Sequence, residues 1–160
     1  MTIAPPAAEE WDRLAADLAR CLSDLAEDEH LILSYKNANY YVQFCAQGSF
    51  GMRAEAVSNA FILPVQAVLT VSDYEHMDEL GWHRATNPPP ERRGEYEPPD
   101  GSPNFFQDLA VPVDWDALAQ LSIRTLREVY RVRHPGELVY KAFVIDGTPM
   151  RFPALRLKRG

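Results

Sequence analysis

The residues that most often bind metal ions are scattered along this chain. No two histidines stand at a spacing typical of a metal site, either with one another or with the two cysteines. His76 lies among acidic residues on one predicted helix, and a solvated acidic face explains that cluster best. The sequence therefore predicts no metal site. The histidines are His30, His76, His83 and His134.

Nucleophilic catalysis also lacks a recognisable set of residues. A nucleophile needs a base beside it, and the chain has no Gly-x-Ser-x-Gly elbow. Cys45 falls within a predicted strand, where we expect it to be buried as a small hydrophobic residue. The segment Gly48-Ser49-Phe50-Gly51 lacks the lysine and the following helix of a phosphate-binding loop, so it favours a turn. We therefore predict that the protein is not an enzyme and uses no cofactor.

Aromatic residues are more plentiful in this chain than one small core obviously requires. Burial in the core is nevertheless their usual place. The connector at residues 59–71 is apolar without a clear period, which indicates either a buried loop or a contact surface. An extended peptide partner needs apolar surface of this kind or an exposed sheet edge. The predicted partner contacts are Tyr40, Phe50, Phe61 and Ile62.

Length and charge limit the class of protein. A chain of 160 residues is long enough to bury a sizeable core, and we expect a single α+β domain over 1–160 with its core at about 7–145. The formal net charge of −7 argues against nucleic acid as a partner. Residues 1–30 carry eight acids and two arginines, whereas residues 124–160 carry nine Lys or Arg and three acids. These two ends are solvated surfaces, or they attract each other within a chain or across a dimer.

Cysteine content and hydropathy indicate a cytoplasmic protein. Two cysteines do not form a disulfide framework, so a reducing compartment is expected. The first residues show no basic and apolar pattern of a signal peptide. The longest apolar run, at 60–71, is interrupted by Pro64 and Gln66 and is too short to cross a membrane.

Apolar periodicity predicts a helix followed by an antiparallel meander. The stripe at 7–29 recurs in three- and four-residue steps, as an amphipathic helix requires. Ser72 and Glu75 fit a capping box that opens a short helix at 73–80, which Gly81 is placed to end. Strand patterns stand at 30–35, 40–46, 52–57, 104–111 and 137–145, a proline-rich loop at 88–103, a long helix at 114–131, and a last strand or extended tail in the C-terminal extension 146–160.

Five short motifs along the chain resemble those of a known family of domains. They are Tyr40-Tyr41-Val42-Gln43-Phe44, Leu80-Gly81-Trp82, Asn104-Phe105-Phe106, Thr125-Leu126-Arg127-Glu128-Val129-Tyr130 and Leu138-Val139-Tyr140-Lys141-Ala142-Phe143. Together they look like the actinobacterial TY-Chap domains, whose superfamily is similar to YbjN proteins and to class I type III secretion chaperones such as CesT. The resemblance covers roughly residues 30–145, and its motifs are structural.

This resemblance implies an α-β-β-β-α-β-β-α core, a tendency to dimerise and a peptide-binding chaperone role without catalysis. Our first hypothesis is therefore an α+β domain with an antiparallel sheet of about five strands, which binds a peptide or protein client as a homodimer. Nucleic acid and membrane are not expected as partners. The alternative is a small-ligand-binding or enzymatic domain with a pocket between the sheet and the long helix.

Overall fold

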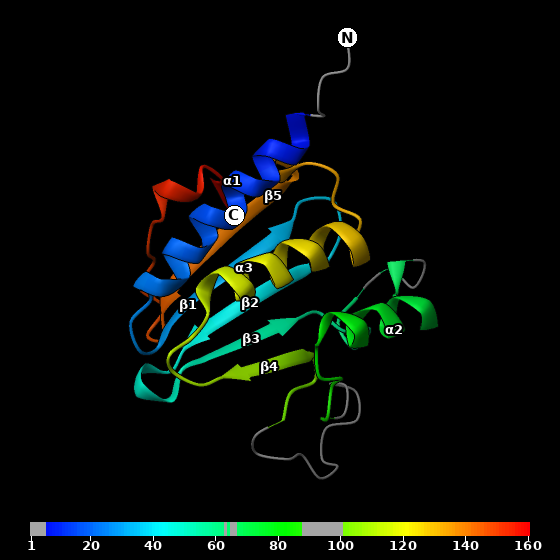
Figure 1. Cartoon of the computed structure of the whole chain (residues 1–160), viewed down its shortest axis with the longest axis horizontal. Coiled ribbons are helices and arrows are strands. Elements are labelled where there is room, and N and C mark those ends of the chain that lie inside the picture. Colours follow the sequence, from blue (N-terminus) through cyan, green and yellow to red (C-terminus); the bar gives the residue numbers. More distant parts are fainter. Residues whose placement is uncertain (1–5, 63, 65–66, 88–100) are drawn as a thin grey trace.

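The computed structural model describes residues 6–62, 64, 67–87 and 101–160, and these form an α+β fold. Helices and strands follow one another as α-β-β-β-α-β-α-β-β (Figure 1). The elements are α1 (Pro6–Asp24), β1 (Glu29–Tyr35), β2 (Tyr41–Ala46), β3 (Met52–Ala56), α2 (Val71–Leu80), β4 (Phe105–Leu109), α3 (Trp115–Arg124), β5 (Leu138–Val144) and β6 (Lys158–Arg159).

The six strands form one mixed sheet in the order β4-β3-β2-β1-β5-β6. All neighbouring pairs are antiparallel except β5 and β6, which run parallel. The predicted meander is thus present at β1 to β3, and the C-terminal extension contributes the short parallel strand. The resemblance places two later strands before the last helix, whereas here α3 stands between β4 and β5.

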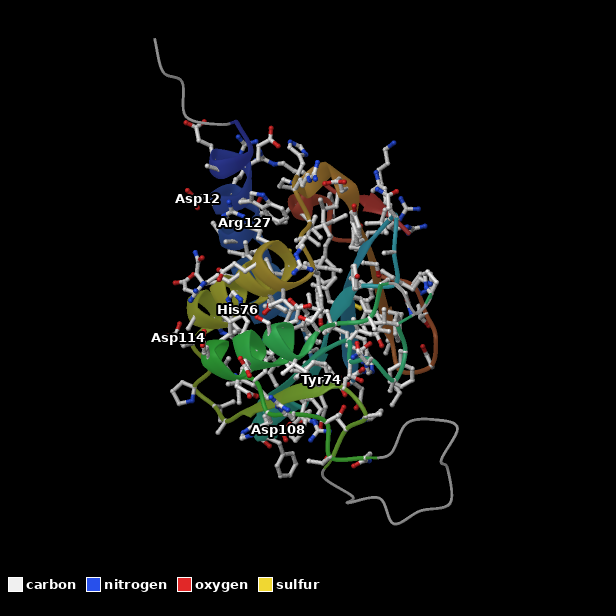
Figure 2. The ribbon with its side chains drawn as sticks, turned by 90° about the vertical axis from the view of Figure 1, so that its right-hand side faces the viewer. Asp12, Tyr74, His76, Asp108, Asp114 and Arg127 are labelled. Atoms are coloured by element: carbon white, nitrogen blue, oxygen red, sulfur yellow. The ribbon has the colours of Figure 1, made fainter. Side chains whose placement is uncertain are left out.

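The helices lie on one side of the sheet, which Figure 2 shows nearly edge-on. Strand residues alternate between two faces, and every second one points toward the helices. The apolar stripe of α1 packs onto that face, and burial of each large side chain contributes roughly 1.5–3 kcal/mol. The buried strand residues include Leu31, Leu33, Val42, Phe44, Met52, Ala54, Ala56, Phe105, Leu138, Tyr140 and Ala142, and those of α1 include Trp11, Leu14, Leu18 and Leu22.

Helix α1 ends at Asp24, earlier than the predicted end at residue 29. Acidic side chains persist through this stretch, and negative charge is unfavourable at the C-terminal pole of a helix dipole. The backbone instead turns at Asp28, which adopts a left-handed conformation with φ of 66°. The N–H of Ala26 donates to the Glu29 carboxylate at 2.7 Å, which fixes this turn.

Helix α2 begins at Val71, two residues earlier than the sequence predicts, so the capping box at Ser72 and Glu75 is wrong. The side chain of Thr70 accepts from the Asp73 N–H at 3.1 Å, and the Asp73 carboxylate accepts from the Thr70 N–H at 2.9 Å. This pair also has the three-residue spacing that a capping box needs. Gly81 ends the helix in the left-handed conformation as expected, with φ of 108°.

Helix α3 and the turn that follows it complete the core. Asp114 caps α3 by accepting from the Ala117 N–H at 3.0 Å, and a π-helical turn continues from Thr125 to Val129. The indole N–H of Trp82 donates to Thr125 Oγ1 at 2.9 Å, which ties the end of α2 to this turn. The helix prediction for 114–131 therefore holds closely. Most of the predicted loop, residues 88–100, lies outside the described residues.

Candidate functional site

The face of the sheet that turns away from the helices is the candidate site. Its side chains come from the alternate positions of the same strands, and most are half-buried. No α-helix among the described residues packs on this side of the sheet (Figure 2). We call it the open face, and define it by two rows of paired residues that cross β5, β1, β2, β3 and β4. The rows are Phe143, His30, Cys45, Arg53 and Asp108, and beside them Lys141, Ile32, Gln43, Glu55 and Phe106.

A hollow of about 130 Å³ opens where the rows cross β1 and β2. The His30 ring stacks on Phe143 with centroids 5.0 Å apart and an angle of 9° between the ring planes. The Cys45 Sγ lies 3.7 Å from His30 Nε2. Apolar and polar groups therefore meet at one hollow. Its lining is His30, Ile32, Gln43, Phe44, Cys45, Glu55 and Phe143.

Cys45 is half-buried on the open face, so the expectation that it is buried in the core is wrong. Its neighbour Phe44 takes the helix-covered face, and alternation leaves Cys45 on the other. Desolvation raises the pKa of the Cys45 thiol, and the charges of Asp28 and Glu55 raise it further. A raised pKa keeps the thiol protonated at neutral pH, which is the unreactive form.

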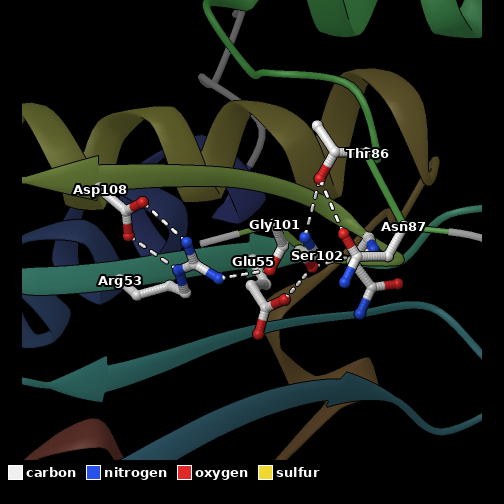
Figure 3. Close-up of polar contacts among 8 residues, drawn as sticks. Arg53, Glu55, Thr86, Asn87, Gly101, Ser102 and Asp108 are labelled. Atoms are coloured by element: carbon white, nitrogen blue, oxygen red, sulfur yellow. Dashed lines mark hydrogen bonds and ion pairs between the residues drawn. The ribbon is translucent and has the colours of Figure 1, made fainter. Parts of the chain in front are cut away.

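One corner of the open face is polar and hydrogen-bonded (Figure 3). Arg53 forms a two-pronged ion pair with Asp108, with both N···O distances at 2.7 Å. The hydrogen bonds from Arg53 lower the pKa of the Asp108 carboxyl. Glu55 accepts from Gln43 at 3.0 Å and also from the Ser102 hydroxyl. Arg53 and Asp108 thus offset each other's charge, and Glu55 is held by neutral donors.

The same corner holds two separate chain segments against the strands. Arg53 donates to the carbonyl of Gly101 at 2.8 Å. The N–H groups of Thr86 and Asn87 both donate to the Ser102 carbonyl, at 2.9 and 3.1 Å. Residues 86–87 and 101–102 are therefore joined to each other, and the strand residues anchor them at the β3–β4 side of the open face (Figure 3).

The opposite side of the open face is positively charged. A second hollow, of about 220 Å³, lies at the outer edge of β5 and shares Phe143 with the first. Lys141 and Arg159, both exposed residues, line it together with apolar residues. The remaining lining residues are Ala142, Gly147, Pro149, Met150 and Gly160.

The four predicted partner contacts do not form one surface. Tyr40 stacks on Tyr130 with centroids 5.1 Å apart, and its hydroxyl donates to the Ala67 carbonyl at 2.6 Å. Phe61 is half-buried beside this end of the sheet, where its carbonyl accepts from Asn39. Ile62 is only 2% exposed and belongs to the core. Phe50, 80% exposed, lies beyond the other end of β2, whose six residues span about 20 Å.

Sequence reasoning passed over Ile32, Lys141 and Phe143. The available signal was strand alternation, because each of these residues neighbours one that is buried. Alternation shows that two faces exist, but it does not show which face the helices cover. The pairing register is what brings these side chains together, and it depends on contacts between distant segments.

Among the described residues, no group of three or more His, Cys, Asp or Glu side chains is arranged to hold a metal ion. Among these same residues, no helix has the length and apolar character needed to cross a membrane.

Comparison with known protein families gives a match. The family model TY-Chap3, described as "T3SS (YopN, CesT) and YbjN peptide-binding chaperone 3", matches residues 4–144. This range covers most of the 160 residues and includes every strand of the open face. Neither the curated proteins nor the solved structures give a match.

Proposed function

The chain belongs to the TY-Chap3 family of peptide-binding chaperones, and on this premise we propose that it binds an extended client segment on the open face of its sheet. The observation that carries the proposal is the presence of half-buried apolar side chains on a face that no described helix covers. Apolar surface grouped in this way marks an interaction site. Ile32 and Phe143 are its central apolar residues.

The proposed role is non-enzymatic. The Cys45 thiol has a raised pKa, so its pairing with His30 lacks the thiolate that a nucleophile needs. The space between α3 and the sheet holds buried side chains, including Leu118, Ile123 and Leu126, where the alternative hypothesis requires a pocket. Binding and release of a client account for the surface without a chemical step.

The connector at residues 59–71 remains a second possible contact surface for the same client. Phe61 and Tyr40 are both half-buried there, and Val71 at the start of α2 is 76% exposed. The Tyr40 hydroxyl already donates a hydrogen bond to the Ala67 carbonyl within the fold. We therefore place the primary contact on the open face and treat Phe61 as the residue that tests the connector.

The test compares neutral substitutions on the two surfaces. Ile32→Ser and Phe143→Ser should each weaken binding to an immobilised array of random peptides by about tenfold or more, because each removes buried apolar contact. The control Ala117→Ser changes an exposed residue of α3, on the helix side, and should bind like the wild type. Loss of binding with Phe61→Ser alone would move the site to the connector. Absence of binding by the folded wild type would overturn the proposed function.

We also propose that the protein forms a homodimer through one end of its sheet. Three large apolar side chains are exposed where β2, β4 and β5 end: Phe50 at 80%, Val111 at 54% and Ile145 at 68%. Exposed apolar groups gathered at one end of a sheet favour association. Sedimentation at tens of micromolar should show a dimer, and Phe50→Ser with Ile145→Ser should shift it to monomer. A monomeric wild type would contradict this proposal.

A further inference from the structure

We propose that the client segment is acidic as well as apolar, and that its carboxylates lie against Lys141 and Arg159 while its apolar side chains occupy the hollows around Phe143. This inference rests on the proposed function, because it names the chemistry of the segment that the open face binds. It commits to a peptide rather than to another kind of anion.

The first support is that some charged side chains near the open face have ionic or hydrogen-bond partners, whereas others have none among the described residues. Arg53 is ion-paired with Asp108, and Glu55 accepts two hydrogen bonds. Lys141 and Arg159, by contrast, make no ion pair or side-chain hydrogen bond with any described residue. Among the described residues, the unpaired positive charges near this face therefore lie at the β5–β6 side, and the Glu55 carboxylate lies on β3, where neutral donors hold it.

The second support is how the edge of β5 is covered. The N–H of Gly160 donates to the Tyr140 carbonyl at 2.8 Å, and the N–H of Met150 donates to the Ala142 carbonyl at 2.8 Å. Two separate segments thus cover β5 on either side of Lys141, and the hollow of about 220 Å³ lies between them. The hollow combines apolar walls with two cations, which suits an apolar side chain that has a carboxylate beside it.

The third support is continuity between the two hollows. Phe143 lines both of them, so a chain that enters at the β5 edge reaches the hollow beside Ile32 and Cys45. An extended segment of about ten residues spans roughly 33 Å, which is enough to contact both hollows. Alternate residues of such a segment face the sheet, so an acidic residue and an apolar residue two positions apart can both contact this surface.

The overall charge of the protein argues for a short acidic segment rather than a polyanion. The formal net charge is −7, so a long nucleic acid is repelled by most of the surface. A peptide with a few carboxylates meets the local cations of β5 and β6 and avoids most of that repulsion. The acidic helix α1 of a second copy is a competing occupant, and its binding would appear as self-association through the same cations.

The experiment uses three fluorescent peptides of about ten residues that share Leu and Phe positions. Glu, Ser or Lys stands two residues away from each Leu or Phe, so that both kinds of side chain face the sheet. Anisotropy should show the Glu peptide binding about tenfold tighter than the Ser peptide in about 50 mM NaCl, with a smaller difference in about 300 mM NaCl. Lys141→Glu and Arg159→Glu should remove this preference while the Ser peptide still binds.

Arg156→Glu is the matched control, because Arg156 lines a different hollow beside α1 and should leave the preference unchanged. Equal binding of the Glu and Lys peptides overturns the inference and leaves the proposed function standing. Failure of all three peptides to bind overturns both. An oligothymidine that competes as well as the Glu peptide, or a self-association that Lys141→Glu abolishes, also overturns the inference.

Discussion

Leu31 and Ile32 are neighbours in β1, yet their side chains meet different surroundings. Leu31 points toward α1 and α3 and is fully buried, whereas Ile32 points to the open face and is half-buried. The same difference separates Phe44 from Cys45 in β2. One set of strands thus supplies a face that the helices close and a face that remains available to a partner.

Polar groups also have different surroundings on the two faces of the sheet. On the helix side, the few buried polar atoms are bonded inside the core, as the Trp82 indole is to Thr125. No buried side-chain nitrogen or oxygen among the described residues lacks a hydrogen-bond partner. On the open face, an ion pair and a free cation lie within one sheet, because nearby water reduces the cost of charge. The closed face therefore serves stability, and we assign binding to the open one.

The largest expected effect separates the two neighbours in β1. Leu31→Ala should lower the free energy of unfolding by about 2–5 kcal/mol, because it leaves a cavity under α1 and α3. Ile32→Ala should cost about 1 kcal/mol or less, since its surroundings are already partly solvated. Urea denaturation of both variants measures the difference. Equal losses would show that the two faces are packed alike.

A smaller effect is expected from a buried hydrogen bond on the helix side. Thr125→Val keeps the shape of the side chain but removes the acceptor of the Trp82 indole N–H. An unpaired buried donor costs about 1–3 kcal/mol, so unfolding should become easier by that amount. Thr125→Ser retains the hydroxyl and serves as the control. If both variants lose the same stability, the hydrogen bond is not responsible.

The smallest effect concerns the ion pair on the open face. Asp108→Asn should destabilise the protein by about 0.5–1 kcal/mol at neutral pH, because solvent screens this half-exposed pair with Arg53. Arg53 lowers the pKa of Asp108 below its ordinary value of 3.8, so the contribution exists above that pH. It is lost as the pH falls through the folded-state pKa.

Denaturation of the wild type and Asp108→Asn across a pH series measures this contribution. The difference between the two proteins should shrink as the pH falls below about 4. A difference that stays constant down to acidic pH would mean that the carboxylate charge is not the source of the stability.

Much of the fold follows from local patterns in the sequence. The apolar stripe of α1, the strand alternation and the glycine that ends α2 each carry a clear signal, and the short motifs indicated the family that the match at residues 4–144 supports. Thr70 with Asp73 and Ser72 with Glu75 both fit a capping box, however, and only the position of α2 against the core decides between them.

The candidate site was harder to predict, because it depends on which face the helices cover. Phe50 and Phe61 were both predicted partner contacts because they are aromatic, but they lie near opposite ends of the sheet. Ile62 was a predicted partner contact in a connector whose pattern fitted either a buried loop or a contact surface, and it is buried. Lys141 carries no motif of its own, and its relation to Phe143 and Arg159 arises only from the pairing of β5 with β1 and β6.

Backbone amide mapping by NMR tests the central claim most directly, namely that a client binds the open face. Titration of the labelled protein with the Glu-containing peptide should shift the amides of β1, β2 and β5 around Ile32, Cys45 and Phe143. The amides of α1 and the first turns of α3 should stay in place. Shifts confined to α1 and α3, with β1 and β5 unchanged, would contradict the assignment of binding to the open face.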